Sequence, residues 1–144
     1  MSSRRALALL LFASLQLAMA WQAVMAAAPA EAIEAFLPRW RAALAAVEAG
    51  DGRPLAELSR LPFLLEGRAL DRDGWARAAP RLLDARLRRC LAQAQPQREG
   101  EAWLLHCRPY SFYLRAGADG RWRLDGFDAD GEDAEDARHA GGRR

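Results

Sequence analysis

Apolar residues recur with a helical period in the middle of the chain and alternate with polar residues near its end. Across residues 31–49 the large apolar side chains stand three or four positions apart, which predicts an amphipathic helix ended by Gly50-Asp51-Gly52. Pro38 lies inside this pattern and has no N–H to donate. We therefore expect either a kink at Pro38 or a regular helix that begins near it.

Shorter elements are expected after this helix. Residues 54–60 favour a short helix, and residues 61–66 form a brief apolar stretch that is typical of a strand. Asp71 or Asp73 is suited to cap a further helical stretch, because a short carboxylate side chain accepts hydrogen bonds from free backbone N–H groups.

A longer helix is expected over residues 81–94, with Pro80 at its first turn, where a missing N–H is harmless. Residues 95–101 are polar and form either a hairpin or a loose connection. The period then changes to two, which predicts antiparallel strands. The three predicted strands are residues 101–108, 111–116 and 121–128, and a turn at residues 117–120 joins the last two.

Strand alternation divides the side chains of these three strands between two faces. One face is apolar and must meet the helices: Trp103, Leu105, Cys107, Phe112, Leu114, Trp122 and Leu124. The other face is mixed: Leu104, His106, Arg108, Tyr113, Arg115, Arg123, Asp125 and Phe127. Helices gathered on one face of an antiparallel sheet make an α+β architecture.

The amino-terminal residues have the composition of an export signal. Two arginines in residues 1–5 precede a run rich in leucine and alanine over residues 6–17, and small residues follow at the spacing of a cleavage site. The run is shorter than the roughly 20 residues that cross a bilayer comfortably, which favours cleavage between residues 20 and 28. We predict a signal peptide over residues 1–26 and a periplasmic or secreted protein, with an uncleaved membrane anchor as the alternative.

The rest of the chain has the length of one domain. Residues 30–128 are expected to form it, and residues 129–144 have the composition of a disordered tail, acidic and then basic. Without Arg4 and Arg5, 19 arginines stand against 19 carboxylates. Since this balance lacks the basic stripe of nucleic-acid binders, no nucleic-acid partner is expected. The chain has no lysine, which excludes Schiff-base and phosphate-loop chemistry.

The predicted export favours a disulfide between the two cysteines, Cys90 and Cys107. Cysteine pairs in oxidising compartments are commonly joined. Helical spacing puts Cys90 on an apolar helix face, and alternation puts Cys107 on the core face of the sheet. We predict a disulfide that joins helix to sheet. Two free core thiols are the alternative, and the absence of a Cys-x-x-Cys spacing disfavours a redox-active pair.

Four pieces of the predicted domain follow one another in order: the aromatic-rich helix 36–51 that ends in Gly-Asp, Leu61-Pro62-Phe63-Leu64, the helical segment 71–90, and the closing piece 119–124. Together they resemble the nuclear transport factor 2-like superfamily, a cone-shaped α+β roll that also includes ketosteroid-isomerase-like proteins. The resemblance implies a curved sheet wrapped around a long helix. It also implies a cone pocket that binds a small apolar ligand, holds a catalytic carboxylate or is filled by side chains.

The isomerase-type members of that superfamily use an acidic or histidine base with tyrosine or acidic oxyanion donors. No matching motif is found in this chain, so no catalytic role is carried over. Glu66 is the one catalytic candidate, because a carboxylate that follows an apolar strand and lies in an apolar pocket can serve as a general base. The alternative is a strand-end carboxylate paired with Arg68.

The mixed sheet face supplies the candidate binding residues His106, Arg108, Tyr113, Arg123 and Asp125, which cross-strand pairing can bring together. The alternatives are a solvent-facing surface with Arg–Asp pairs, and a homodimer contact helped by Leu104, Tyr113 and Phe127. No metal site or cofactor is expected, because no His, Cys or Asp cluster has ligand spacing.

Three hypotheses for function follow. The first is an exported domain that binds a ligand or partner without turnover. The second is a small enzyme of isomerase, dehydratase or hydrolase type that uses the cone pocket. The third is a membrane-tethered accessory module, which requires that the signal be retained.

Overall fold

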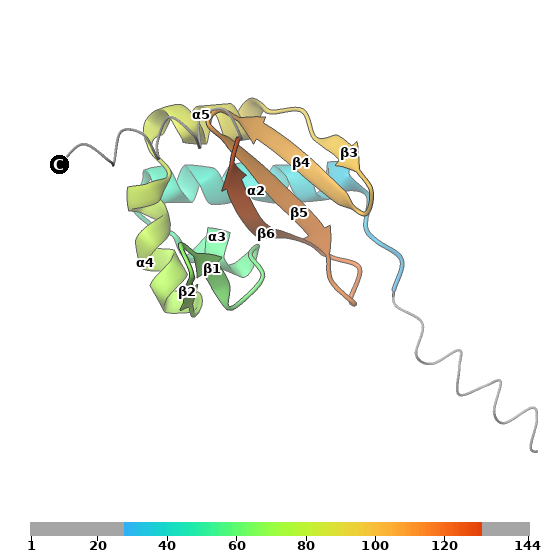
Figure 1. Ribbon diagram of the computed structural model, residues 1–144, viewed down its shortest axis with the longest axis horizontal. Helices are drawn as coiled ribbons and strands as arrows, with labels where there is room; N and C mark the ends of the chain where they lie inside the picture. The colour runs from blue at the N-terminus through green and yellow to red at the C-terminus, as the bar shows by residue number, and fades with distance from the viewer. Residues whose placement is uncertain (1–27, 131–144) are drawn as a thin grey trace, which may run out of the picture.

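Helices precede most of a curved antiparallel sheet in the computed structural model, which describes residues 28–130 (Figure 1). The helices in this range are α2 (Ile33–Glu48), α3 (Arg53–Glu57), α4 (Arg72–Leu82) and α5 (Ala85–Gln93). The strands are β1 (Phe63–Leu65), β2 (Arg68–Leu70), β3 (Gln97–Glu99), β4 (Ala102–Cys107), β5 (Tyr110–Ala116) and β6 (Trp122–Ala129). The predicted α+β class is confirmed.

The main sheet is the meander β3-β4-β5-β6, in which every neighbouring pair is antiparallel. The three strands predicted from alternation are confirmed, and residues 95–101 adopt the hairpin alternative through β3. Helix α2 runs across one face of this sheet, with α5 beside its end (Figure 1). Strands β1 and β2 form a separate hairpin next to α4.

The core lies between α2 and the sheet. It is built from the predicted apolar sheet face, of which only Trp103 is half-buried rather than buried. From α2, Phe36 and Trp40 enter this layer almost without exposure, and Trp40 Nε1 donates to the carbonyl of Leu91 at 3.2 Å. Pro38 lies within α2, so the helix begins before it and continues through it.

The assignment of Phe127 to the mixed face was wrong. Tyr113 pairs with Gly126, but Leu114 pairs with Leu124, so Asp125 is an extra residue that forms a β-bulge. The bulge shifts the alternation by one position and turns Phe127 toward the helices, where its ring centroid lies 5.1 Å from that of Phe112. Because Leu104 is also buried, only Tyr113 remains of the three residues expected to help a dimer contact.

The single helix expected over residues 81–94 is divided. Pro80 lies inside α4, which continues to Leu82 instead of restarting at the proline. The Asp84 carboxylate then accepts a hydrogen bond from the N–H of Leu87 at 2.8 Å and caps α5. A short acidic side chain that satisfies free N–H groups favours a new helix start at this point.

The disulfide between Cys90 and Cys107 is present and joins α5 to β4, with the two Cα atoms 5.8 Å apart. Cys107 is buried and Cys90 is half-buried. No helix in residues 28–130 is both long and apolar enough to span a membrane. The predicted signal peptide, and all of the predicted tail after residue 130, lie outside the described residues.

Gly52, just before α3, lies against the backbone of α4. A Cβ atom at this position would lie 2.0 Å from the backbone carbonyl oxygen of Ala76. That oxygen is four residues before Pro80, which has no N–H to donate to it. The absence of a side chain at Gly52 therefore lets the α3 start pack directly on α4.

We expect Gly52→Ala to lower the free energy of unfolding by about 1–3 kcal/mol, because the clash is with backbone and must be relieved by moving α3 or α4. Urea denaturation measures this change. Gly126→Ala is the matched control, since a Cβ there meets nothing within 4 Å. Equal stability of the two variants would contradict the proposed close contact.

Candidate functional site

The β1–β2 hairpin is closed by a two-residue turn, Glu66-Gly67. Both residues have a positive φ, 50° and 76°, which is the conformation of the turns that join tightly paired strands. Residues 61–66 had predicted only one strand, so β2 was missed. The turn fixes the register in which Leu65 lies opposite Arg68.

One face of this hairpin is turned toward α4. Phe63 and Leu70 are paired across the strands and share that face with Leu65 and Arg68. The buried Phe63 ring stacks on Trp75 of α4, with the ring centroids 4.0 Å apart. This stacking holds the hairpin beside the helix.

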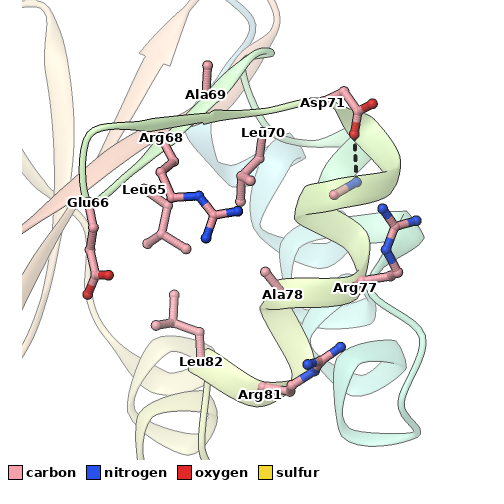
Figure 2. Close-up of a pocket in the computed structure, with 11 residues that line it drawn as sticks. Leu65, Glu66, Arg68, Ala69, Leu70, Asp71, Arg77, Ala78, Arg81 and Leu82 are labelled. Atoms are coloured by element: carbon pink, nitrogen blue, oxygen red, sulfur yellow. Dashed lines mark hydrogen bonds between the residues drawn. The ribbon is translucent and has the colours of Figure 1, made fainter.

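A pocket of about 670 Å³ opens between the hairpin and α4 (Figure 2). Its apolar lining is aliphatic: Leu65, Ala69, Leu70, Ala78 and Leu82. Its charged lining is mainly basic: Glu66, Arg68, Asp71, Arg77 and Arg81. Figure 2 shows Leu65 and Leu82 facing each other, with the Arg68 side chain reaching from the hairpin toward the helix. A volume of this size is within the range of small-molecule sites.

Glu66 is exposed at the hairpin turn, on the rim of this pocket. Within residues 28–130 it forms no ion pair with Arg68, so neither the buried general base nor the predicted pair describes its surroundings. The other carboxylate, Asp71, accepts a hydrogen bond from the N–H of Gly74 at 2.7 Å and caps α4. Its role is therefore already structural.

The pocket arginines differ from the arginines that are paired with carboxylates. Arg53 is paired with Asp51 and Arg123 with Asp119, at 3.0 and 2.7 Å. In the described part of the chain the following have no hydrogen-bonding or ionic partner through their side chains: Arg68, Arg77 and Arg81. Their guanidinium groups are free to bind a ligand.

Two of these arginines stand one helical turn apart. Arg77 and Arg81 are four residues apart on α4 and both are exposed. Like charges at this spacing oppose each other by about 0.2–0.5 kcal/mol in an isolated helix. An anion bound to both guanidinium groups would relieve this repulsion.

The five candidate residues of the mixed face do not meet in one site. His106 lies near one end of it, with Nδ1 2.8 Å from Ser111 Oγ, and Ser111 donates to Asp130 at 2.7 Å. Because the single hydroxyl hydrogen goes to Asp130, the Nδ1 atom must carry the hydrogen in its contact with Ser111. Ser111 thus lies in the middle of the hydrogen-bonded chain His106–Ser111–Asp130. In the hydrolase triad the middle residue is the histidine.

Burial raises the pKa of the Tyr113 hydroxyl, and the neighbouring Asp128 carboxylate adds to this effect. The hydroxyl is therefore a proton donor rather than a base near neutrality.

Arg108 is exposed and lies in the connection between β4 and β5.

Arg123 and Asp125 line a different, polar groove of about 600 Å³. Asp125 accepts from Arg60 at 3.0 Å and pairs with Arg115 at 3.1 Å. Asp125 is thus already paired with two of the arginines that line this groove.

Hydrogen bonds from Arg123, and then the backbone N–H of Arg121, hold the pKa of Asp119 far below its ordinary value. A lowered folded-state pKa contributes stability that is complete above the unfolded value of about 3.9 and is lost as the pH falls below it. We expect the temperature of half-unfolding to fall less for Asp119→Asn than for the wild type when the pH is lowered from about 4 to about 2. The difference should be small and should shrink in high salt, because the pair is at the surface. Parallel midpoint curves would contradict this assignment.

No protein-family model, curated protein or solved structure matches the chain. The function is therefore inferred from the geometry of the described residues. Within them, no group of three or more His, Cys, Asp or Glu side chains is arranged to hold a metal ion.

Sequence reasoning named Glu66 on the pocket rim but missed Arg68, Arg77 and Arg81 as a group. On an isolated helix Arg81 would lie on a solvated face, so its position in the sequence alone indicates no site. The signals that point to the group are the Glu66-Gly67 turn, which folds the chain back, and the spacing of two arginines on α4.

Proposed function

We propose that this chain is an exported domain of the nuclear transport factor 2-like type that binds a small ligand without turnover. The ligand site is the pocket between the β1–β2 hairpin and α4. The observation that carries this proposal is the joint presence of an aliphatic lining and unpaired arginines in a pocket of about 670 Å³.

The element order supports the family assignment. A long α2 crosses a curved four-stranded meander, and a parallel bridge between Ser59 and Leu124 brings the segment before the hairpin beside β6. The disulfide supports export, since cysteine pairs persist in oxidising compartments.

The packing of the cone interior argues against the ligand site that the resemblance first implied. Aromatic side chains that each expose 1% or less of their surface fill that space: Phe36, Trp40, Phe63, Trp75 and Phe112. A small apolar ligand inside the cone would have to displace them at the cost of core packing. The surface pocket requires no such displacement.

Binding is favoured over catalysis by the chemistry of the interior. In residues 28–130 the buried polar residues are Ser59 and Ser111, and both hydroxyls are engaged in hydrogen bonds. Glu66, the catalytic candidate, is exposed. The membrane-tethered alternative depends on residues 1–26, which lie outside the described range.

The proposal is tested with 8-anilinonaphthalene-1-sulfonate (ANS), which fluoresces when its rings enter an apolar site. We expect saturable enhancement with the oxidised, exported protein. Ala78→Phe should weaken it at least about tenfold, because the added ring occupies the pocket.

Ala35→Phe introduces the same side chain at an exposed α2 position and is the control, which should bind ANS like the wild type. Circular dichroism checks that both variants are folded. Absence of saturable binding, or equal binding by Ala78→Phe and the wild type, would overturn the proposed site.

A further inference from the structure

We infer that the ligand of the hairpin pocket carries a single anionic group, of carboxylate type, at the end of an aliphatic body, and that Arg68 binds this group. This inference rests on the proposed function and adds the chemical class of the ligand. It follows from the charges, pairing and register of the pocket residues.

The charge of the lining favours an anion. Three arginines stand against two carboxylates, and one of these, Asp71, is engaged as the helix cap of α4. Elsewhere in the described range, four arginines are joined to the carboxylates of Asp51, Asp119 and Asp125: Arg53, Arg60, Arg115 and Arg123. The pocket lining thus includes three guanidinium groups without an anionic partner from residues 28–130.

The position of Arg68 makes it the best placed of the three. Its register opposite Leu65 directs it to the hairpin face that is turned toward α4. In Figure 2 its side chain extends between Leu65 and Leu70, across the apolar part of the pocket, whereas Arg77 and Arg81 come from the helix side. The planar guanidinium suits a two-point contact with a carboxylate.

The aliphatic lining defines the other end of the ligand. Leu65, Leu70, Ala78 and Leu82 offer no hydrogen-bonding side chains, so they favour an alkyl chain over a sugar or a nucleotide. The same chemistry is present in free alkyl carboxylates and in anionic membrane lipids. We commit to the free molecule, because the site is a hollow between two elements rather than an apolar surface projecting from the domain.

Isothermal titration calorimetry on the oxidised, exported protein tests the inference with three probes of equal chain length: decanoate, 1-decanol and decyltrimethylammonium. We expect decanoate to bind at least about tenfold more tightly than 1-decanol, and the cation to bind most weakly. The preference for decanoate should decrease with added salt.

Two charge variants should act in opposite directions. Arg68→Gln should weaken decanoate about tenfold and leave 1-decanol unchanged, whereas Glu66→Gln should tighten decanoate about twofold by removing a rim carboxylate. Arg86→Gln is the matched control, because Arg86 is exposed on α5 and lines none of the pockets described above. It removes the same charge and should change nothing. Arg81→Gln is a second variant in case Arg68→Gln does not fold.

The outcomes separate the two proposals. Equal affinity for decanoate and 1-decanol overturns the anionic head group and leaves the binding site intact. If neither probe binds and ANS does not bind either, both proposals fail. Arg68-dependent binding to phosphatidylglycerol vesicles without binding of decanoate also overturns the inference, since the anion would then belong to a membrane surface.

Discussion

Trp75→Ala is expected to lower the free energy of unfolding by about 3–5 kcal/mol, the cost of removing a large buried aromatic side chain. Trp75 has no exposed surface and stacks on Phe63 at a centroid distance of 4.0 Å. Its Nε1 donates to Ser59 Oγ at 2.9 Å, and Ser59 in turn donates to the carbonyl of Leu55 at 2.7 Å. One side chain thus joins α4, the hairpin and the α3 region.

Urea denaturation measures the loss, and ANS titration of the folded fraction measures its effect on the pocket. The hairpin loses its anchor in Trp75→Ala, so ANS binding should also be lost. Trp75→Phe keeps an aromatic ring against Phe63 while it removes the indole N–H. Its free energy of unfolding should therefore decrease distinctly less than that of Trp75→Ala. A decrease below about 1 kcal/mol in Trp75→Ala would show that the hairpin is held by other contacts.

Reduction of the Cys90–Cys107 disulfide is expected to cost about 3 kcal/mol of stability by the chain-entropy model for a loop of this length. The bond connects residues 17 apart in sequence and joins α5 to β4. Since the loop it closes includes β3, reduction frees the edge of the sheet as well as the helix.

Thermal unfolding with and without dithiothreitol measures this contribution. The double variant Cys90→Ala and Cys107→Ala should unfold at a lower temperature than the oxidised wild type and should not respond to dithiothreitol. An unchanged midpoint after complete reduction, checked by thiol alkylation and mass, would contradict a stabilising role.

Much of the fold was predictable because its sheet follows a clean period of two. Leu105, Phe112, Leu114 and Leu124 were assigned to the core face from alternation alone, and all are buried. Phe127 was not, because a bulge adds one residue at Asp125. Gly126 beside it is the local signal that was missed, since an isolated glycine inside a strand pattern suggests a bulge. Register is decided by pairing with β5, which is a tertiary contact.

The candidate site was less predictable than the fold. Glu66 was noticed as a carboxylate after an apolar stretch, but its neighbours depend on how the hairpin folds onto α4. The α4 arginines are separated from the hairpin by the turn at Asp71, and on an isolated helix they would simply be solvated. The stacking of Phe63 on Trp75 helps to bring the two sets together.

The most direct test of the proposed binding site is a ¹⁵N amide chemical-shift map of the oxidised protein titrated with ANS, whose rings shift nearby resonances. We expect the largest shifts at Leu65, Arg68, Ala78 and Leu82, on the two sides of the hairpin pocket. Largest shifts at His106 and Tyr113 on the mixed sheet face, or around Trp40 in the interior, would contradict this location.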